Sequence, residues 1–233
     1  MGKSGPMPSE SYRFVDHASY LDEFFRKRFK ENEKVTLIGH EWGAALAFYW
    51  AYRNPERVHA IIHMESIVAP FSINDFPASG RDMYLALRSP IGEDLVYRKN
   101  VFIKNVMPDN IQRQLQDEEL KAYKDPYRES LCRKPMLQWA RQVPLLEDGP
   151  ADVISIADKY RRWLCTSDIP KLYIHASPGF YSNHVLKRTR HWRNQRVKKV
   201  SGHHYLQEDS PKEIANTIVR FLDSLEHSED VQL

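Results

Sequence analysis

One short segment of the sequence has the residue types and spacing that covalent catalysis requires. It is Gly39-His40-Glu41-Trp42-Gly43, which lies between an apolar run and a helical pattern. This order predicts a tight turn from strand to helix that presents its middle residue, Glu41, at the helix N-terminus. A carboxylate there suits alkyl transfer, in which an ester forms on the enzyme and water then hydrolyses it. A glycine-flanked turn can also be purely structural in any α/β protein, so this segment needs partners elsewhere.

Glu65 and His204 are the partners that the sequence offers. Glu65 follows the apolar run 58–64, and His204 follows the run 196–200. The carboxyl ends of parallel strands lie at one edge of a sheet, so we expect both residues beside Glu41. A histidine there can deprotonate water, and a carboxylate can orient its ring. Taken singly, Glu65 is better explained as a helix-cap or loop acid and His204 as a histidine packed beside His203, but together with the turn the three residues favour catalysis.

The elements that must hold these residues follow from apolar runs and helical periodicity. Four strands are predicted at 35–38, 58–64, 171–175 and 196–200, and helices at 16–31, from 42 to about 54, and at 211–226. Strands that alternate with helices indicate βαβ units. The sequence therefore predicts an α/β fold with a parallel sheet covered by helices on both faces.

Residues 69–156 interrupt this alternation with a charged, proline-punctuated and helix-rich stretch. It follows the carboxyl end of the second predicted strand, where ligands of parallel sheets bind, so we expect a lid there. The predicted organisation is a core made of residues 1–68 and 157–233, and a helical cap made of residues 69–156.

Composition excludes several classes of protein. The 34 Lys and Arg against 31 Asp and Glu give a net charge of +3, which is too weak to indicate a nucleic-acid partner. No apolar run reaches the roughly 18 residues of a membrane span, and no secretory signal is visible. The pair His203-His204 has no metal-ligand spacing around it. We expect a cytoplasmic protein with no metal and no nucleic-acid or membrane partner.

Several segments together resemble the haloalkane dehalogenase family of α/β-hydrolases, and within it the Renilla-type coelenterazine luciferases. They are Gly39 to Ala44, Met64-Glu65-Ser66, Pro178 to Asn183 and Gln207-Glu208-Asp209, so the resemblance extends over nearly the whole chain. It implies an α/β-hydrolase fold with a helical cap insertion and no cofactor. It also implies a small apolar or aromatic substrate, either a coelenterazine-type luciferin that O2 oxidises or a haloalkane that is hydrolysed.

The resemblance further implies roles for single residues. Glu41 takes the place of the family's nucleophile, Glu65 that of the catalytic acid and His204 that of the base. The residues implied to bind substrate or halide are Trp42, Phe76, Phe180 and Tyr181.

The sequence departs from the family in two ways. The family has aspartate where Glu41 stands, and a misplacement of about 1 Å can cost on the order of a hundredfold in rate. The family's first four strands are also missing, along with a His-Gly-Asn turn; loss of one such oxyanion donor typically costs about a hundred- to a thousandfold. Gly2 to Gly5 resemble the turn after the fourth strand. We therefore expect an incomplete core whose first strand, 35–38, has an unpaired edge, and hence poor solubility or domain swapping.

Two other interpretations stay open. The chain can be a non-catalytic α/β-hydrolase fragment or pseudoenzyme that keeps a pocket. It can also be an epoxide hydrolase-like enzyme, with cap tyrosines as acids, namely Tyr84, Tyr97, Tyr123 and Tyr127. The absence of an acid after the strand that ends near Ser177 counts against the second.

Overall fold

The computed structural model describes residues 2–229 of the chain. Their contacts group the chain into two compact units, one made of Met1–Glu31 and Ala69–Arg161, the other of Asn32–Val68 and Arg162–Leu233. The predicted cap, residues 69–156, lies within the first unit; that it acts as a lid stays a prediction.

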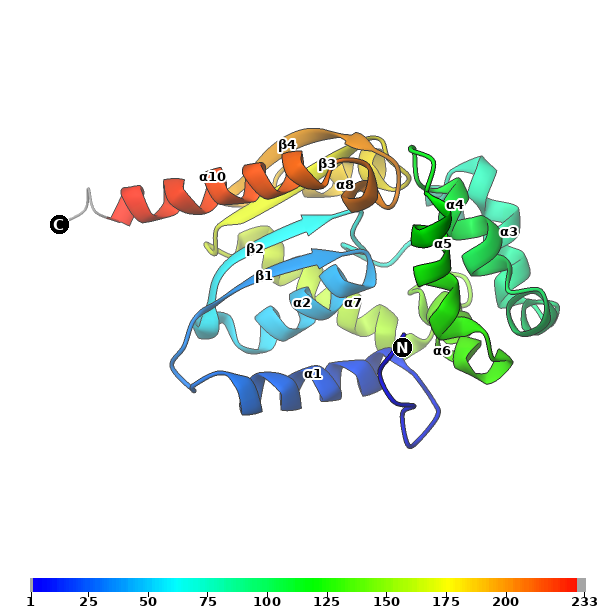
Figure 1. The fold of residues 1–233 in the computed structure, drawn as a ribbon. Coiled ribbons are helices and arrows are strands. Elements are labelled where there is room, and N and C mark those ends of the chain that lie inside the picture. The colour runs from blue at the N-terminus through cyan, green and yellow to red at the C-terminus, as the bar shows by residue number, and fades with distance from the viewer. Residues whose placement is uncertain (1, 230–233) are drawn as a thin grey trace. The chain divides into compact units, whose positions relative to one another are not determined.

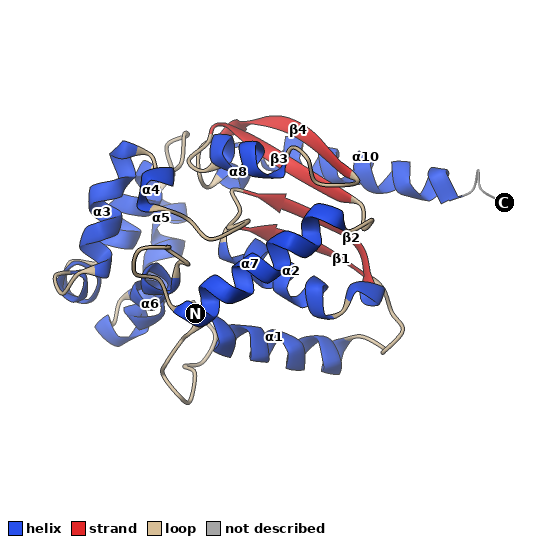
Figure 2. Ribbon diagram, turned by 180° about the vertical axis from the view of Figure 1, so that it is seen from behind, coloured by secondary structure: helices blue, strands red, loops and turns tan. Residues whose placement is uncertain are grey.

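The second unit is built on one parallel sheet (Figure 2). Its strands are β1 (Val35–His40), β2 (Val58–Met64), β3 (Lys171–Pro178) and β4 (Gln195–Gly202), and they lie side by side in that order. All four strands were predicted, and the parallel α/β fold is confirmed.

Helices cover both faces of this sheet (Figure 1). On one face, alternate residues of β2 and β3 form an apolar core with α10 (Pro211–Glu229), including Ile62, Ile174 and Phe221. On the other face α2 (Trp42–Arg53) packs against the sheet, with the Phe48 ring 5.2 Å from that of His63. Helix α8 (Ser182–Thr189) follows β3 and contacts it. The alternating side chains of β2 and β3 are therefore buried on both faces, whereas most residues of β4 are exposed.

Three strands extend beyond their predicted carboxyl ends, among them β4, which continues to Gly202. β1 continues to His40 because its pairing with β2 continues, with His40 opposite Met64. β3 continues to Pro178, opposite Gly202 of β4. Because of these extra pairs, the predicted site residues follow closely after the ends of the strands.

β1 lies at the edge of the sheet. Within residues 2–229 it pairs with β2 alone, and the Ile38 side chain is 55% exposed. An exposed apolar edge strand favours association with other chains. The expected poor solubility or domain swapping stays a prediction.

The first unit is helical. Its helices are α1 (Phe14–Arg28), α3 (Ala78–Arg88), α4 (Met107–Asp109), α5 (Asp117–Lys124), α6 (Lys134–Gln142) and most of α7 (Ala151–Thr166). Leu87, Val96 and Leu137 are among the residues of its apolar core. Helix α1 is held in this unit by an ion pair between Arg13 and Asp152 at 2.5 Å. It ends three residues before the predicted 31, where Phe29 turns to an extended conformation. No helix among the described residues is long and apolar enough to cross a membrane.

Candidate active site

Glu41 occupies a strained turn between β1 and α2. Its φ of +49° lies in the left-handed region that costs free energy for a residue with a side chain. The turn is anchored by the Glu41 N–H, which donates to the carbonyl of Met64 at the end of β2 over 3.2 Å. The Glu41 carboxylate bends back and accepts the N–H of Trp42 at 2.5 Å, so it caps its own helix. The predicted presentation of a carboxylate at the α2 N-terminus is what this geometry provides.

The two glycines of the turn differ in what they do. A Cβ on Gly39 would lie 2.5 Å from the Ala44 Cα atom, so only glycine lets strand and helix approach this closely. A Cβ on Gly43 would meet nothing within 4 Å. The close approach of strand and helix therefore requires glycine at position 39 but not at position 43.

Burial raises the pKa of Glu41 to about 7. The positive field of His204 and the bond from the Trp42 N–H act in the opposite direction but do not outweigh burial. Glu41 is therefore a carboxyl group that changes its protonation near neutral pH, unlike an ordinary surface glutamate.

Glu65 is fully buried directly after β2 and also has a positive φ, +46°. Its Oε2 accepts the main-chain N–H groups of Phe180 at 3.0 Å and Tyr181 at 2.7 Å, and it faces the His204 Nδ1 at 3.1 Å. Its Oε1 accepts the hydroxyl of Ser182. Burial alone would raise the pKa of Glu65, but these donors outweigh it and lower the pKa, so Glu65 is ionised.

Ser182 connects the acid to the end of β3. Its Oγ accepts the N–H of Ala176 at 2.9 Å, which leaves the hydroxyl proton for Glu65. The Tyr173 hydroxyl donates to the Ser182 carbonyl at 2.9 Å. The start of α8 is thereby fixed, together with the two N–H groups that hold Glu65.

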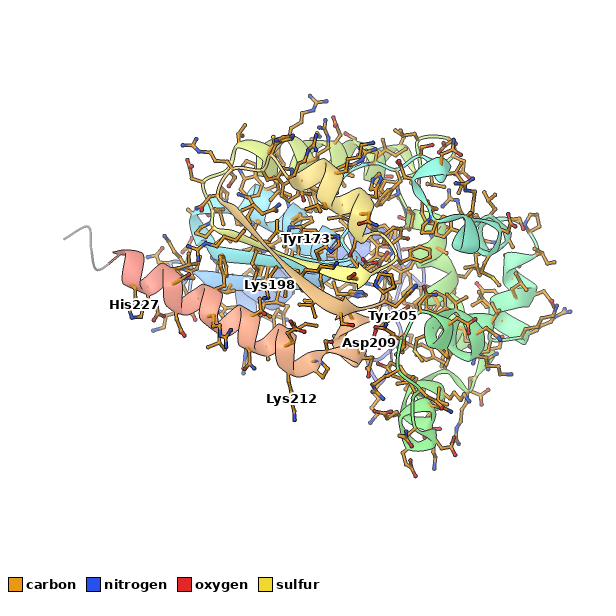
Figure 3. The ribbon with its side chains drawn as sticks, turned by 90° about the horizontal axis from the view of Figure 1, so that it is seen from above. Tyr173, Lys198, Tyr205, Asp209, Lys212 and His227 are labelled. Atoms are coloured by element: carbon orange, nitrogen blue, oxygen red, sulfur yellow. The ribbon has the colours of Figure 1, made fainter. Side chains whose placement is uncertain are left out.

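His204 lies in the loop between β4 and α9 (Leu206–Asp209), among aromatic rings. Its ring is 5.8 Å from that of Phe180, 5.4 Å from that of Tyr181 and 4.8 Å from that of Tyr205. The His203 N–H donates to the Asp209 carboxylate at 2.8 Å and closes the loop. Figure 3 shows Tyr205 and Asp209 where β4 gives way to this short helix. Because a carboxylate can only accept, His204 carries its proton on Nδ1 and leaves Nε2 able to take one.

Most predicted site residues come together in the second unit. Hydrogen bonds and ring contacts join four of them, namely Glu65, His204, Phe180 and Tyr181. Glu41 is connected to this group through its bond to the Met64 main chain. Trp42 follows directly as the first residue of α2. The catalytic and binding roles assigned to these residues stay predictions.

Phe76 belongs to the first unit. Its buried ring packs against Phe71 at 5.7 Å and against Tyr84 at 4.4 Å between centroids. Both of these partner rings belong to the same unit. Its implied part in substrate binding stays a prediction.

Sequence reasoning missed two residues of the site. Ser182 holds Glu65, and His40 contacts the main chain of His204 through its Nε2 at 2.7 Å. Both residues lie in segments on which the family resemblance rests. A serine or a histidine at such a position does not by itself indicate a contact with a residue more than a hundred positions away.

Comparison with known proteins agrees with this architecture. The model of the α/β hydrolase fold matches residues 1–211. A haloalkane dehalogenase of Sphingobium indicum is 41% identical over 222 residues, which are 94% of this chain and 74% of that protein. The coelenterazine h 2-monooxygenase of Renilla reniformis is 37% identical over 226 residues, or 96% of this chain and 72% of that protein. The crystal structure of a putative ancestral haloalkane dehalogenase superposes with a TM-score of 0.91 at 35% identity, covering 97% of this chain and 80% of that one.

Proposed function

We propose a function for this chain on the basis of its family. The chain belongs to the haloalkane dehalogenase family of α/β-hydrolases. The proposal is that it oxidises a coelenterazine-type luciferin with O2, without a cofactor. The observation that carries it is the 3.1 Å contact between the fully buried Glu65 and the Nδ1 of His204, in a site where burial also raises the pKa of Glu41 to about 7.

Oxidation of such a luciferin begins with loss of a proton from its heteroaromatic ring. His204 Nε2 is the free base of the pair, and Glu65 stabilises the imidazolium that forms. O2, the oxidant, then adds to the electron-rich carbon of the anion as a peroxide, which attacks the adjacent ring carbonyl and displaces its nitrogen. Cleavage of the O–O bond and of the bond between the two carbons releases CO2 and leaves an amide, each with one oxygen of O2. Phe180, Tyr181 and Trp42 supply aromatic surface for a flat substrate, and none of these steps requires attack by Glu41.

Hydrolytic dehalogenation is the second candidate, because relatives at 40–41% identity are haloalkane dehalogenases. In that reaction a Glu41 oxygen attacks the substrate carbon, and halide leaves with the electron pair of the C–X bond. His204 then takes a proton from water, the hydroxide attacks the ester carbonyl, and the alcohol leaves. This sequence needs Glu41 ionised and turned toward the substrate, whereas its carboxylate is bonded to the Trp42 N–H.

Two assays on the purified chain separate these functions. One mixes it with coelenterazine and records light and CO2; the other mixes it with 1,2-dibromoethane and records bromide. We expect light without bromide. Bromide release at a rate that depends on Glu41 would replace the luciferin proposal by dehalogenation.

The variant His204→Gln is the matched control, because glutamine keeps a polar side chain but no base. We expect it to lose the light signal while its melting temperature stays near that of the parent chain. Folded parent protein that gives neither light nor bromide would favour the non-catalytic interpretation.

A further inference from the structure

His40, the last residue of β1, makes a contact that neither proposed reaction uses. Its Nε2 lies 2.7 Å from the main-chain carbonyl oxygen of His204. Its ring also lies 4.9 Å from the His204 ring and 5.6 Å from the Tyr205 ring, both tilted against it. One side chain at the end of β1 therefore touches the loop after β4 at three places.

The chemistry of this contact fixes the protonation of His40. A carbonyl oxygen can only accept, so the Nε2 of His40 carries the proton and donates it. Burial lowers the pKa of the His40 imidazole to about 3, and the positive field of His204 acts in the same direction. At neutral pH His40 is therefore an uncharged donor.

We propose that His40 is a positioning residue that holds the His204 loop so that the imidazole keeps its bond to Glu65. The proposal rests on the function proposed above, in which His204 is the base. It follows from which atom each anchor of the loop holds. Glu65 fixes the His204 ring through Nδ1, Asp209 fixes the main chain at His203, and the carbonyls of Gly202 and Tyr205 accept the N–H groups of Gly179 and Glu208. The carbonyl of His204 itself is fixed by His40, on the strand that also positions Glu41.

Other groups around His204 do not supply the same constraint. The ionisable groups that face its ring are Glu41 and Glu65 from the ends of β1 and β2, and the phenols of Tyr181 and Tyr205. Each of these acts on the imidazole or packs against it. His40 instead bonds the backbone from which the imidazole projects, so we expect its loss to move the base rather than to change the field on it.

The test uses two substitutions at this position and one elsewhere. His40→Phe keeps a ring and removes the donor, whereas His40→Gln keeps an N–H donor and removes the ring. The control is His175→Phe, which removes a buried histidine of the same unit whose Nε2 lies 3.3 Å from the Asn183 side chain. Melting temperatures of all three show how much of any effect is stability.

Two readouts decide the outcome. The first is the proton resonance of the His204 Nδ1–H, assigned by its absence in His204→Gln. The second is kcat and KM on whichever proposed substrate the parent chain turns over. We expect His40→Phe to shift or broaden the resonance and to lower kcat by about ten- to a hundredfold with KM within about twofold. His40→Gln restores most of both, and His175→Phe changes neither.

With these two measurements, the role of His40 can be tested independently of the proposed function. If the parent chain turns over no substrate, the function fails, but the Nδ1–H resonance still tests His40. The proposal is overturned if His40→Phe leaves that resonance where it is in the parent, or if His40→Phe and His175→Phe lose activity equally.

Discussion

Glu65 and His204 are 139 residues apart in the sequence, and the Glu65 Oε2 lies 3.1 Å from the His204 Nδ1. The acid is fully buried, and the side chain of the base is 13% exposed. Glu65 receives four donors in all, two from the main chain at the start of α8 and two from side chains. Since every one of its neighbours donates, the site is built to hold a negative charge at this position.

The first prediction concerns that charge. Glu65→Gln replaces a carboxylate, whose two oxygens both accept hydrogen bonds, by an amide. The NH2 group of that amide must then face groups that also donate. We expect kcat on the proposed substrate to fall by about a thousand- to ten-thousandfold, as when the acid of a catalytic triad becomes an amide. The measurement is steady-state kinetics at saturating substrate. Glu213→Gln, at an exposed position of α10, is the control. Glu65→Gln activity close to that of the control would exclude the proposed orienting role.

The sequence was sufficient for the four strands and for helices α1, α2 and α10, whereas the roles of the three chemical groups stay predictions. Strong apolar runs located the strands, and parallel topology placed Glu41, Glu65 and His204 at one sheet edge. It could not locate the contacts of Ser182 and His40, because each depends on main-chain atoms that other elements bring near. The sequence also could not show that Gly39 is crowded and Gly43 is not, because crowding at a glycine depends on how closely two segments approach rather than on residue type.

The second prediction separates those two glycines. Gly39→Ala puts a methyl group 2.5 Å from the backbone of Ala44, and we expect it to lower the free energy of unfolding by about 1–3 kcal/mol. Gly43→Ala meets open space within a helix, so we expect it to be neutral or to stabilise by up to about 1 kcal/mol. Urea denaturation of both variants measures the difference. Equal losses in the two would show that strand and helix do not approach as described.

The third prediction concerns Lys171, a fully buried lysine at the start of β3. Its ammonium donates to the carbonyls of Ser167, Ile169 and Arg193 at 2.7, 2.8 and 2.9 Å, although burial lowers its pKa to about 8. Lys171→Met leaves those carbonyls without their donor, so we expect a loss of about 2 kcal/mol in the free energy of unfolding at pH 7. Chemical denaturation is the measurement.

Lys199→Met is the matched control for Lys171, because Lys199 is exposed on the neighbouring strand β4. We expect a change within about 0.5 kcal/mol there. A Lys171→Met variant as stable as this control would mean that the ammonium does not hold the three carbonyls.

The fourth prediction follows from the pKa of Glu41, which burial raises to about 7 from an ordinary value near 4.5. The folded state therefore holds a proton on Glu41 between about pH 4.5 and pH 7, where the unfolded state has lost it. Stability from this group is complete below pH 4.5 and is lost as the pH rises to 7. Glu41→Gln cannot ionise, so we expect it to be more stable than the parent by about 2–3 kcal/mol at pH 8 and nearly equal to it at pH 4.5.

Denaturation curves at these two pH values test the Glu41 effect, with Glu213→Gln again as the exposed control. A stability difference between Glu41→Gln and the parent that does not grow with pH would show that Glu41 ionises as an ordinary surface acid does.

The fifth prediction concerns the effect of the extra methylene of Glu41 on attack at the substrate carbon. The Glu41 carboxylate reaches back to the Trp42 N–H, and an aspartate is one carbon shorter. We expect Glu41→Asp to release bromide from 1,2-dibromoethane at least about tenfold faster than the parent, since attacking groups misplaced by about 1 Å react far more slowly.

A second change in the same variant tests the mechanism of that gain. Adding His204→Gln to Glu41→Asp removes the base, so the alkyl ester should form and not be hydrolysed. Mass spectrometry should then find the aspartate-bearing peptide heavier by the bromoethyl group, with one bromide released per chain. Bromide release by Glu41→Asp at the parent's rate, with no such adduct in the double variant, would show that something other than the methylene limits carbon attack at this turn.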